Sequence, residues 1–177
     1  MSAPQQVWTR SMVESLPADD RLKRAEVLEG ELVVSPGGDF AHEDLVMRIA
    51  TQLRRAAPPE VAVLASGFAF HYDSGADNYA LADITVARRV DCYRRGLWAP
   101  PLLLVEVLST YSRRRDLLQK RRLYARGRVP AYWVVDADAP SFTVLHLADD
   151  GYDEQTTGVT ELVTERPFPV RVDLLHD

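Results

Sequence analysis

The feature that most constrains this chain is an apolar run, Leu102–Leu108, interrupted by one acid, Glu106. A continuous apolar run of this length is typical of a central strand covered on both faces of a sheet. Burying an unpaired carboxylate costs roughly several kcal/mol, so Glu106 needs a partner, and a cation is the obvious candidate. The run therefore predicts a buried strand that carries a functional acid.

The remaining patterns predict a mixed α/β (α+β) fold, in which strands lie in the middle and a helix covers either side. The 177 residues suit one domain, which we expect to span residues 1–177 with a peripheral segment over about 1–20. Turn and capping signals place a hairpin around Glu29–Gly30 and a helix from Asp39 to about Ala57. The expected later elements are strands Val61–Tyr72, Tyr79–Val86, Leu102–Leu108 and Ala131–Asp136, a helix from about Ser112 to Gly127, and a peripheral antiparallel section after Ser141.

Composition narrows the surroundings of the protein. Cys92 is the only cysteine, which fits a reducing compartment, and no apolar stretch approaches the roughly 20 residues that a membrane helix needs. We therefore expect a cytoplasmic protein without a membrane partner. The net charge is −5, yet residues 113–128 hold eight basic side chains and one acid. A basic face of this kind can hold phosphates, although such a cluster is by default a solvated helix face.

Two acids lie within apolar strands and are separated by little more than a loop. If the strands of Asp83 and Glu106 are neighbours, both carboxylates can point into one cleft. Magnesium is typically held by one or two carboxylates with waters and phosphate oxygens, and the main-chain carbonyl of Val107 could add a ligand. For Asp83 alone, a solvated or arginine-paired acid explains the residue equally well; for Glu106 the functional interpretation is favoured.

Three further residues are candidates with alternatives. Lys120 could orient or deprotonate a metal-bound water and offset charge at the phosphate, but it also forms a common i, i+4 surface pair with Asp116. His42 could be a ligand or base, and a capping or core histidine is slightly favoured. Glu31 could be an auxiliary ligand or an acid beside a turn.

The residues also match a known pattern in ordered blocks over about residues 10–150. The blocks are Glu26-Val-Leu-Glu-Gly-Glu31-Leu-Val-Val-Ser35-Pro36, His42, Ala82-Asp83, Leu104-Val-Glu106-Val-Leu-Ser109, Arg113-Arg-Arg-Asp116 with Lys120, and Leu123-Tyr-Ala-Arg-Gly-Arg-Val-Pro130-Ala-Tyr-Trp-Val-Val-Asp136. The chain in this respect resembles the Uma-type restriction endonuclease family, a bacterial branch of the PD-(D/E)XK nuclease superfamily.

The resemblance implies a restriction-endonuclease-like core with a central mixed sheet flanked by helices. Asp83 would be the motif aspartate, Glu106 the second metal-binding acid, and Lys120 the motif lysine, moved from the strand to the following helix. Glu31 and His42 match positions near the site, whereas Tyr124, Tyr132 and Trp133 match positions that we interpret as packing.

We therefore expect a Mg²⁺- or Mn²⁺-dependent endonuclease that hydrolyses DNA. The arginines expected to bind its phosphates are Arg113, Arg114, Arg115, Arg121 and Arg122. A homodimer is expected if both strands are cut, because two strands favour two sites. The rival hypothesis is a catalytically inactive nuclease-fold module that binds nucleic acid or a protein partner. A third hypothesis is that the arginines only form a solvated helix face and bind no nucleic acid.

Overall fold

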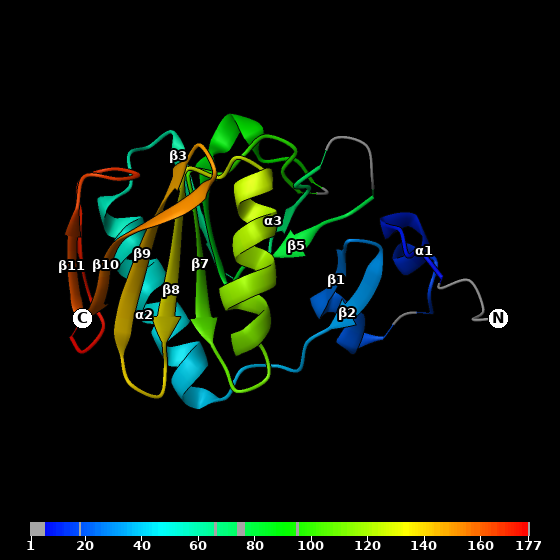
Figure 1. The fold of residues 1–177 in the computed structure, drawn as a ribbon, viewed down its shortest axis with the longest axis horizontal. Helices are drawn as coiled ribbons and strands as arrows, with labels where there is room; N and C mark the ends of the chain where they lie inside the picture. Colours follow the sequence, from blue (N-terminus) through cyan, green and yellow to red (C-terminus); the bar gives the residue numbers. More distant parts are fainter. Residues whose placement is uncertain (1–5, 18, 66, 74–76, 95, 177) are drawn as a thin grey trace.

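A six-stranded mixed sheet forms the centre of the protein (Figure 1). The computed structural model describes residues 6–17, 19–65, 67–73, 77–94 and 96–176. The strand order is β10-β9-β8-β7-β6-β3; β7 and β8 are parallel, and the other neighbours are antiparallel. The strands are β3 (Val61–Ala65), β6 (Ile84–Arg88), β7 (Leu103–Leu108), β8 (Ala131–Asp136), β9 (Ser141–Ala148) and β10 (Gly151–Val159).

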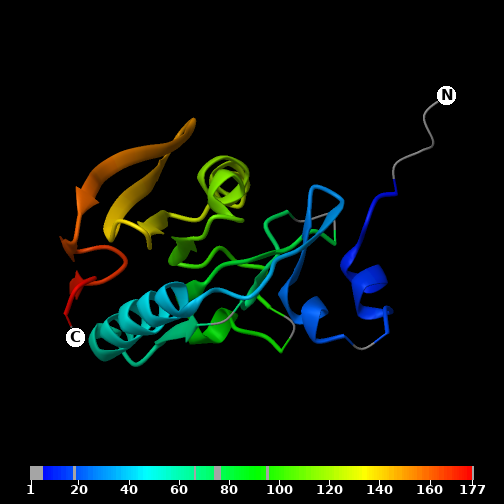
Figure 2. The same cartoon turned by 90° about the horizontal axis from the view of Figure 1, so that it is seen from below.

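Helices cover the two faces of this sheet, as the sequence predicts. Helix α2 (Phe40–Ala56) lies on one face and α3 (Arg121–Arg126) on the other, which is clearest when the sheet is viewed from below (Figure 2). The Asp39 side chain caps α2 by accepting a hydrogen bond from the His42 N–H. The apolar stripe expected for this helix is buried: Leu45, Val46, Ile49, Ala50 and Leu53.

The crossover from β7 to β8 differs from the single regular helix that the sequence predicts. Residues Arg115–Lys120 form a π-helix, and only the following residues continue as α3. A π-helical turn is wider than an α-helical one and is often found at functional sites. Here it carries Asp116 and Lys120, which are both buried. The wider turn therefore belongs to the part of the crossover that faces the sheet.

Two of the expected strands are each divided in the structure. The stretch Val61–Tyr72 contains β3 and the separate β4 (Ala69–Phe70), and Tyr79–Val86 contains β5 (Ala80–Leu81) before β6. Gly67 has φ of +68° between the first two, which is a conformation that glycine adopts readily. β4 and β5 pair with each other outside the central sheet. Asp83 consequently lies in the break between β5 and β6.

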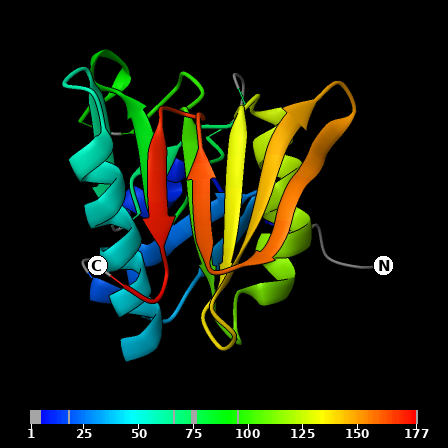
Figure 3. The same ribbon diagram turned by 90° about the vertical axis from the view of Figure 1, so that its left-hand side faces the viewer.

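Smaller elements surround the sheet. The expected N-terminal hairpin forms, and at the opposite end of the molecule a second hairpin covers the sheet face on which α2 lies (Figure 3). These elements are α1 (Arg10–Glu14), a 3₁₀ turn (Asp20–Arg24), β1 (Ala25–Leu28), β2 (Glu31–Val34), a 3₁₀ turn (Arg89–Asp91), β11 (Glu161–Thr164) and β12 (Val170–Asp173).

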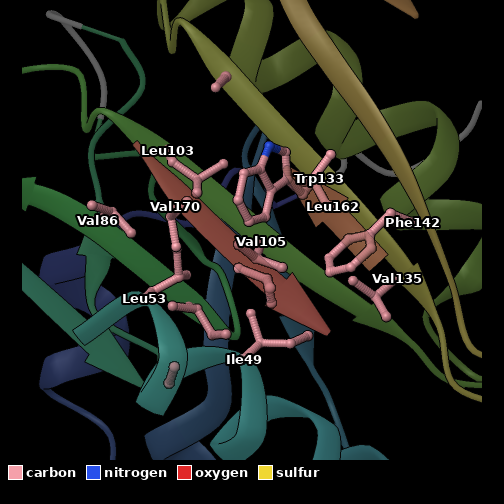
Figure 4. Packing of buried hydrophobic residues seen from close by; sticks show 14 of the residues in the cluster. Ile49, Leu53, Val86, Leu103, Val105, Trp133, Val135, Phe142, Leu162 and Val170 are labelled. Carbon is pink, nitrogen blue, oxygen red and sulfur yellow. The ribbon is translucent and has the colours of Figure 1, made fainter. Parts of the chain in front are cut away.

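Alternation along β7 separates two hydrophobic clusters. Val105 and its neighbours on one face pack with Ile49 and Leu53 of α2 and with Trp133 of β8 (Figure 4). Leu104 and Leu108 belong to the cluster on the other face, beneath α3. Glu106 shares that second face because side chains alternate along a strand. Within the described residues, no helix combines the length and apolar character needed to cross a membrane.

Candidate active site

Asp83 and Glu106 come together at the point where β6 ends beside β7. Ile84 pairs with Val105, so one further step of the antiparallel register would set Asp83 opposite Glu106. Residues opposite each other in such a ladder have Cβ atoms about 4.5–5.5 Å apart. The β6 pairing stops before this step, and the Val107 N–H donates instead to Asp83 Oδ2 at 2.9 Å. Both acids line a cleft of about 300 Å³.

Glu106 is 3% exposed and has two hydrogen-bond donors on the helical crossover. Lys120 Nζ donates to Glu106 Oε1 at 2.8 Å, and the Tyr124 hydroxyl donates to the same oxygen at 2.7 Å. Lys120 therefore lies beside Glu106 rather than on a solvated helix face. Tyr124 was expected only to pack, but its hydroxyl contacts the candidate site directly.

The buried hairpin strand β1 supplies an acid that the sequence reasoning did not select. Glu26 Oε1 lies 3.0 Å from Lys120 Nζ and accepts a hydrogen bond from the Leu81 N–H at 2.8 Å. Lys120 also donates to the Leu81 carbonyl at 2.8 Å. Glu26 interrupts the short apolar run Ala25–Leu28, just as Glu106 interrupts the run of its own strand. This signal is hidden in the sequence because two more glutamates, Glu29 and Glu31, follow closely in the same hairpin.

Asp116 is a further buried carboxylate of the cleft lining, beside Asp83, Glu106 and Glu26. It is 1% exposed, and its Oδ1 lies 3.8 Å from both Lys120 Nζ and Arg115 Nε. Burial raises the pKa of Asp116, although Lys120 and the Ser112 hydroxyl act to lower it. The i, i+4 pair of Asp116 and Lys120 is thus buried, which sequence spacing alone does not reveal.

The charges of this cluster are not balanced by Lys120 alone. Burial raises the pKa of Glu106 well above its usual range, against the lowering effect of Lys120; Asp116, Asp83 and Glu26 raise it further. Burial alone would lower the pKa of Lys120, but Glu106, Glu26 and Asp116 raise it above its ordinary value. Lys120 is therefore held as an ammonium ion among more carboxylates than it can neutralise.

His42 contacts the other acid of the pair. Its Nε2 lies 3.3 Å from Asp83 Oδ2, and this hydrogen bond raises the pKa of His42 despite partial burial. Burial acts to raise the pKa of Asp83, but His42 and the Val107 N–H lower it overall. A Cβ on Gly38 would collide with the His42 ring, so glycine at position 38 permits this approach. His42 thus both follows the helix cap and contacts the site.

The predicted auxiliary acid Glu31 lies elsewhere. It is exposed at the start of β2 and is not among the residues lining the cleft. The acid of this hairpin that contacts Lys120 is instead Glu26, which is buried in β1. The hairpin therefore contributes one acid to the site, and it is a different acid from the expected one.

Most of the arginines expected to bind phosphates have partners within the protein. Arg113 pairs with Asp136 (2.8 Å), and Arg122 pairs with Glu29 (2.6 Å). The other contacts are Arg115 to the Ser35 hydroxyl at 2.8 Å and Arg121 to the Tyr152 carbonyl at 2.7 Å. Arg114 is exposed and has no partner among the described residues. These contacts attach the crossover to its surroundings, and among the five arginines only Arg114 has no side-chain partner in the described part of the chain.

The donor set of the cleft fits a divalent cation that takes oxygen ligands. No three His, Cys, Asp or Glu side chains among the described residues surround one metal position. Magnesium, however, often uses only one or two carboxylates and completes its shell with water. Asp83 Oδ1 and Glu106 Oε2 accept no hydrogen bond from any described residue. These two oxygens are therefore the positions of the cleft at which a cation would find carboxylate ligands.

A known structure shares this architecture. A "putative nuclease belonging to DUF820" from Anabaena variabilis superposes with a TM-score of 0.73 at 15% sequence identity, and the match covers 94% of this chain and 95% of that one. At this identity the likeness shows the fold alone, which is a mixed α/β fold. A comparison with curated proteins finds no match.

The sequence itself shows the family. The family model Uma2, described as "Putative restriction endonuclease", matches residues 11–175. This range contains Asp83, Glu106 and Lys120 together with the whole central sheet. The chain therefore belongs to the Uma2 family, which confirms the family and the fold class that the sequence predicts.

Proposed function

We propose that this protein is a divalent-metal-dependent endonuclease that hydrolyses phosphodiester bonds in DNA. The observation that carries the proposal is the meeting of Asp83 and Glu106 across the end of β6, with Lys120 at 2.8 Å from Glu106. Asp83 and Glu106 would hold the metal. The carbonyl of Val107 would join them, because its N–H already faces Asp83 and both groups of a strand residue point to the same side.

A bound Mg²⁺ or Mn²⁺ would activate water and neutralise charge at the phosphate. The protein's own groups would prepare that position. His42 orients Asp83, while the Tyr124 hydroxyl and Lys120 orient Glu106. The Lys120 ammonium donates to the Leu81 carbonyl and to Glu106, and it forms an ion pair with Glu26 at 3.0 Å. These contacts, with the raised pKa of Lys120, support a positioning role rather than a general base.

Assays with plasmid and single-stranded DNA in Mn²⁺ test this proposal. Asp83→Asn and Glu106→Gln should each reduce cleavage on the order of 100-fold or more, because each removes a ligand charge. The exposed residues Asp153 and Glu154 provide matched controls as Asp153→Asn and Glu154→Gln, which should cleave normally. Calorimetric titration with Mn²⁺ alone should show weakened binding in the two site variants.

Two results would contradict the proposal. Cleavage that persists in both Asp83→Asn and Glu106→Gln would show that the site lies elsewhere or that the activity comes from a contaminant. DNA binding without cleavage in the presence of metal would instead favour the non-catalytic nuclease-fold module.

A further inference from the structure

Two aromatic side chains that neighbour cleft-lining residues in the chain are almost fully exposed. Phe40 is 85% exposed and Tyr111 is 81% exposed, the two highest values among the large hydrophobic side chains that the structure describes. Phe40 begins α2 between Gly38 and His42, which both line the cleft. Tyr111 lies in the segment after β7, between the cleft residues Ser109 and Ser112. Each segment thus presents one ring to solvent.

The segments that carry these rings are joined to each other. Arg115 donates to the Ser35 hydroxyl at 2.8 Å, linking the crossover to the segment that leads into α2. Figures 1 and 2 show the start of α2 and the chain after β7 at the same end of the molecule. Phe40 and Tyr111 therefore lie in two neighbouring segments whose adjacent residues line one cleft.

Reciprocal hydrogen bonds fix the turn that exposes Tyr111. The Ser112 N–H donates to Ser109 Oγ, the Ser109 N–H donates to Ser112 Oγ (both 3.2 Å), and the two hydroxyls are 3.1 Å apart. The intervening residues, Thr110 and Tyr111, are exposed. Three positions after Tyr111 is Arg114, which is exposed and has no side-chain partner among the described residues. A ring and an unpaired cation consequently lie in the same segment.

Single exposed hydrophobic residues are common on protein surfaces and need no ligand. Here, however, two exposed rings and an unpaired guanidinium belong to the segments that line a cleft whose acids suit phosphodiester chemistry. Aromatic rings stack on nucleic-acid bases, and arginine contacts the backbone, in sites for single strands. In an intact duplex the faces of the bases are already stacked on one another, so only unpaired bases can use such rings.

We propose that Phe40 and Tyr111 are stacking platforms for unpaired bases beside the cleft, with Arg114 contacting the backbone. The cleft therefore takes single-stranded or locally unpaired DNA in preference to an intact duplex. This inference rests on the proposed nuclease function and specifies its substrate. A single strand needs one site, so the second copy that cutting a duplex favours is not required.

Binding measured without metal separates this inference from the catalytic proposal. In EDTA, a fluorescently labelled 20-nucleotide single strand and a hairpin duplex of the same composition are titrated with protein and followed by anisotropy. Phe40→Ala and Tyr111→Ala should each weaken single-strand binding on the order of ten-fold while changing duplex binding little. Tyr111→Phe keeps the ring and should bind as the unaltered protein does.

The control is Tyr93→Ala, which removes a ring that is 57% exposed and whose chain neighbours Cys92 and Arg94 do not line the cleft. Its single-strand affinity should be unchanged. The stacking inference is wrong if Phe40→Ala and Tyr111→Ala both bind the single strand as tightly as the unaltered protein does. It is also wrong if these variants lose duplex affinity to the same extent as single-strand affinity. If the unaltered protein binds neither DNA at low salt, the proposed nuclease function fails as well.

Discussion

The two faces of β7 show how one strand can serve two purposes. On one face Leu103, Val105 and Val107 pack into an apolar cluster with α2. On the other face Glu106 stands between Leu104 and Leu108 and has lysine and tyrosine as partners. The apolar face gains stability from burial alone. The acid-bearing face requires every buried charge to have a partner, because unpaired buried charges are costly.

This difference predicts that the apolar face dominates stability. Trp133 is fully buried against Phe142 at a ring-centroid distance of 5.7 Å. Trp133→Ala should therefore lower the free energy of unfolding by roughly 4 kcal/mol, measured by urea denaturation. Trp98→Ala is the matched control, because Trp98 is 53% exposed, and its effect should be smaller. Equal losses in the two variants would contradict the assignment of the main core to this face.

On the acid-bearing face, we expect a smaller loss of free energy of unfolding, and this loss should depend on whether Glu106 is charged. Lys120→Met removes the cation from Glu106 and Glu26 and should cost about 3 kcal/mol. The same substitution in a Glu106→Gln background should cost at least about 1 kcal/mol less, because one of the stranded acids is then neutral. Urea denaturation of the four proteins completes this double-mutant cycle. Additive losses would mean that Lys120 does not stabilise Glu106.

The comparison of faces also shows what could be predicted from the sequence. Local patterns were sufficient for α2, β7 and β8, since a cap at Asp39 and apolar runs determine these elements. Glu106 could be selected because one acid in an apolar strand is conspicuous. Lys120 could not be distinguished from Arg121 or Arg122 by its local sequence, and only the family resemblance selected it.

The remaining site residues depend on contacts between distant parts of the chain. Glu26 reaches Lys120 only because the N-terminal hairpin folds against the crossover. The π-helix that carries Asp116 and Lys120 also has no clear signal in the sequence, because these residues fit a regular helix equally well. Partners for Arg113 and Arg122 likewise come from remote segments. Side-chain type was therefore easier to predict than the direction in which each side chain points.

Asp116 offers the most subtle test of the acid-bearing face. Because burial raises its pKa, the folded protein binds this proton more tightly than the unfolded chain does. The contribution of Asp116 to stability is therefore highest below the ordinary pKa of 3.8 and falls as the pH rises through the higher folded value. Asp116→Asn removes this dependence. Asp116→Asn should therefore stabilise the protein more at pH 8 than at pH 4. The difference between the two pH values should be on the order of 1 kcal/mol in the free energy of unfolding, or a few degrees in melting temperature.

Thermal unfolding at the two pH values measures this difference directly. The exposed Asp150→Asn controls for the loss of one negative charge from an acidic protein. We compare the melting temperature of Asp116→Asn with that of the unaltered protein. If this difference in melting temperature stays constant or shrinks from pH 4 to pH 8, the raised pKa of Asp116 is contradicted. A growing difference with Asp116→Asn, absent with Asp150→Asn, would show that the Asp116 carboxylate opposes folding at neutral pH. The apolar face of β7, by contrast, holds no titratable group and stabilises the fold at any pH.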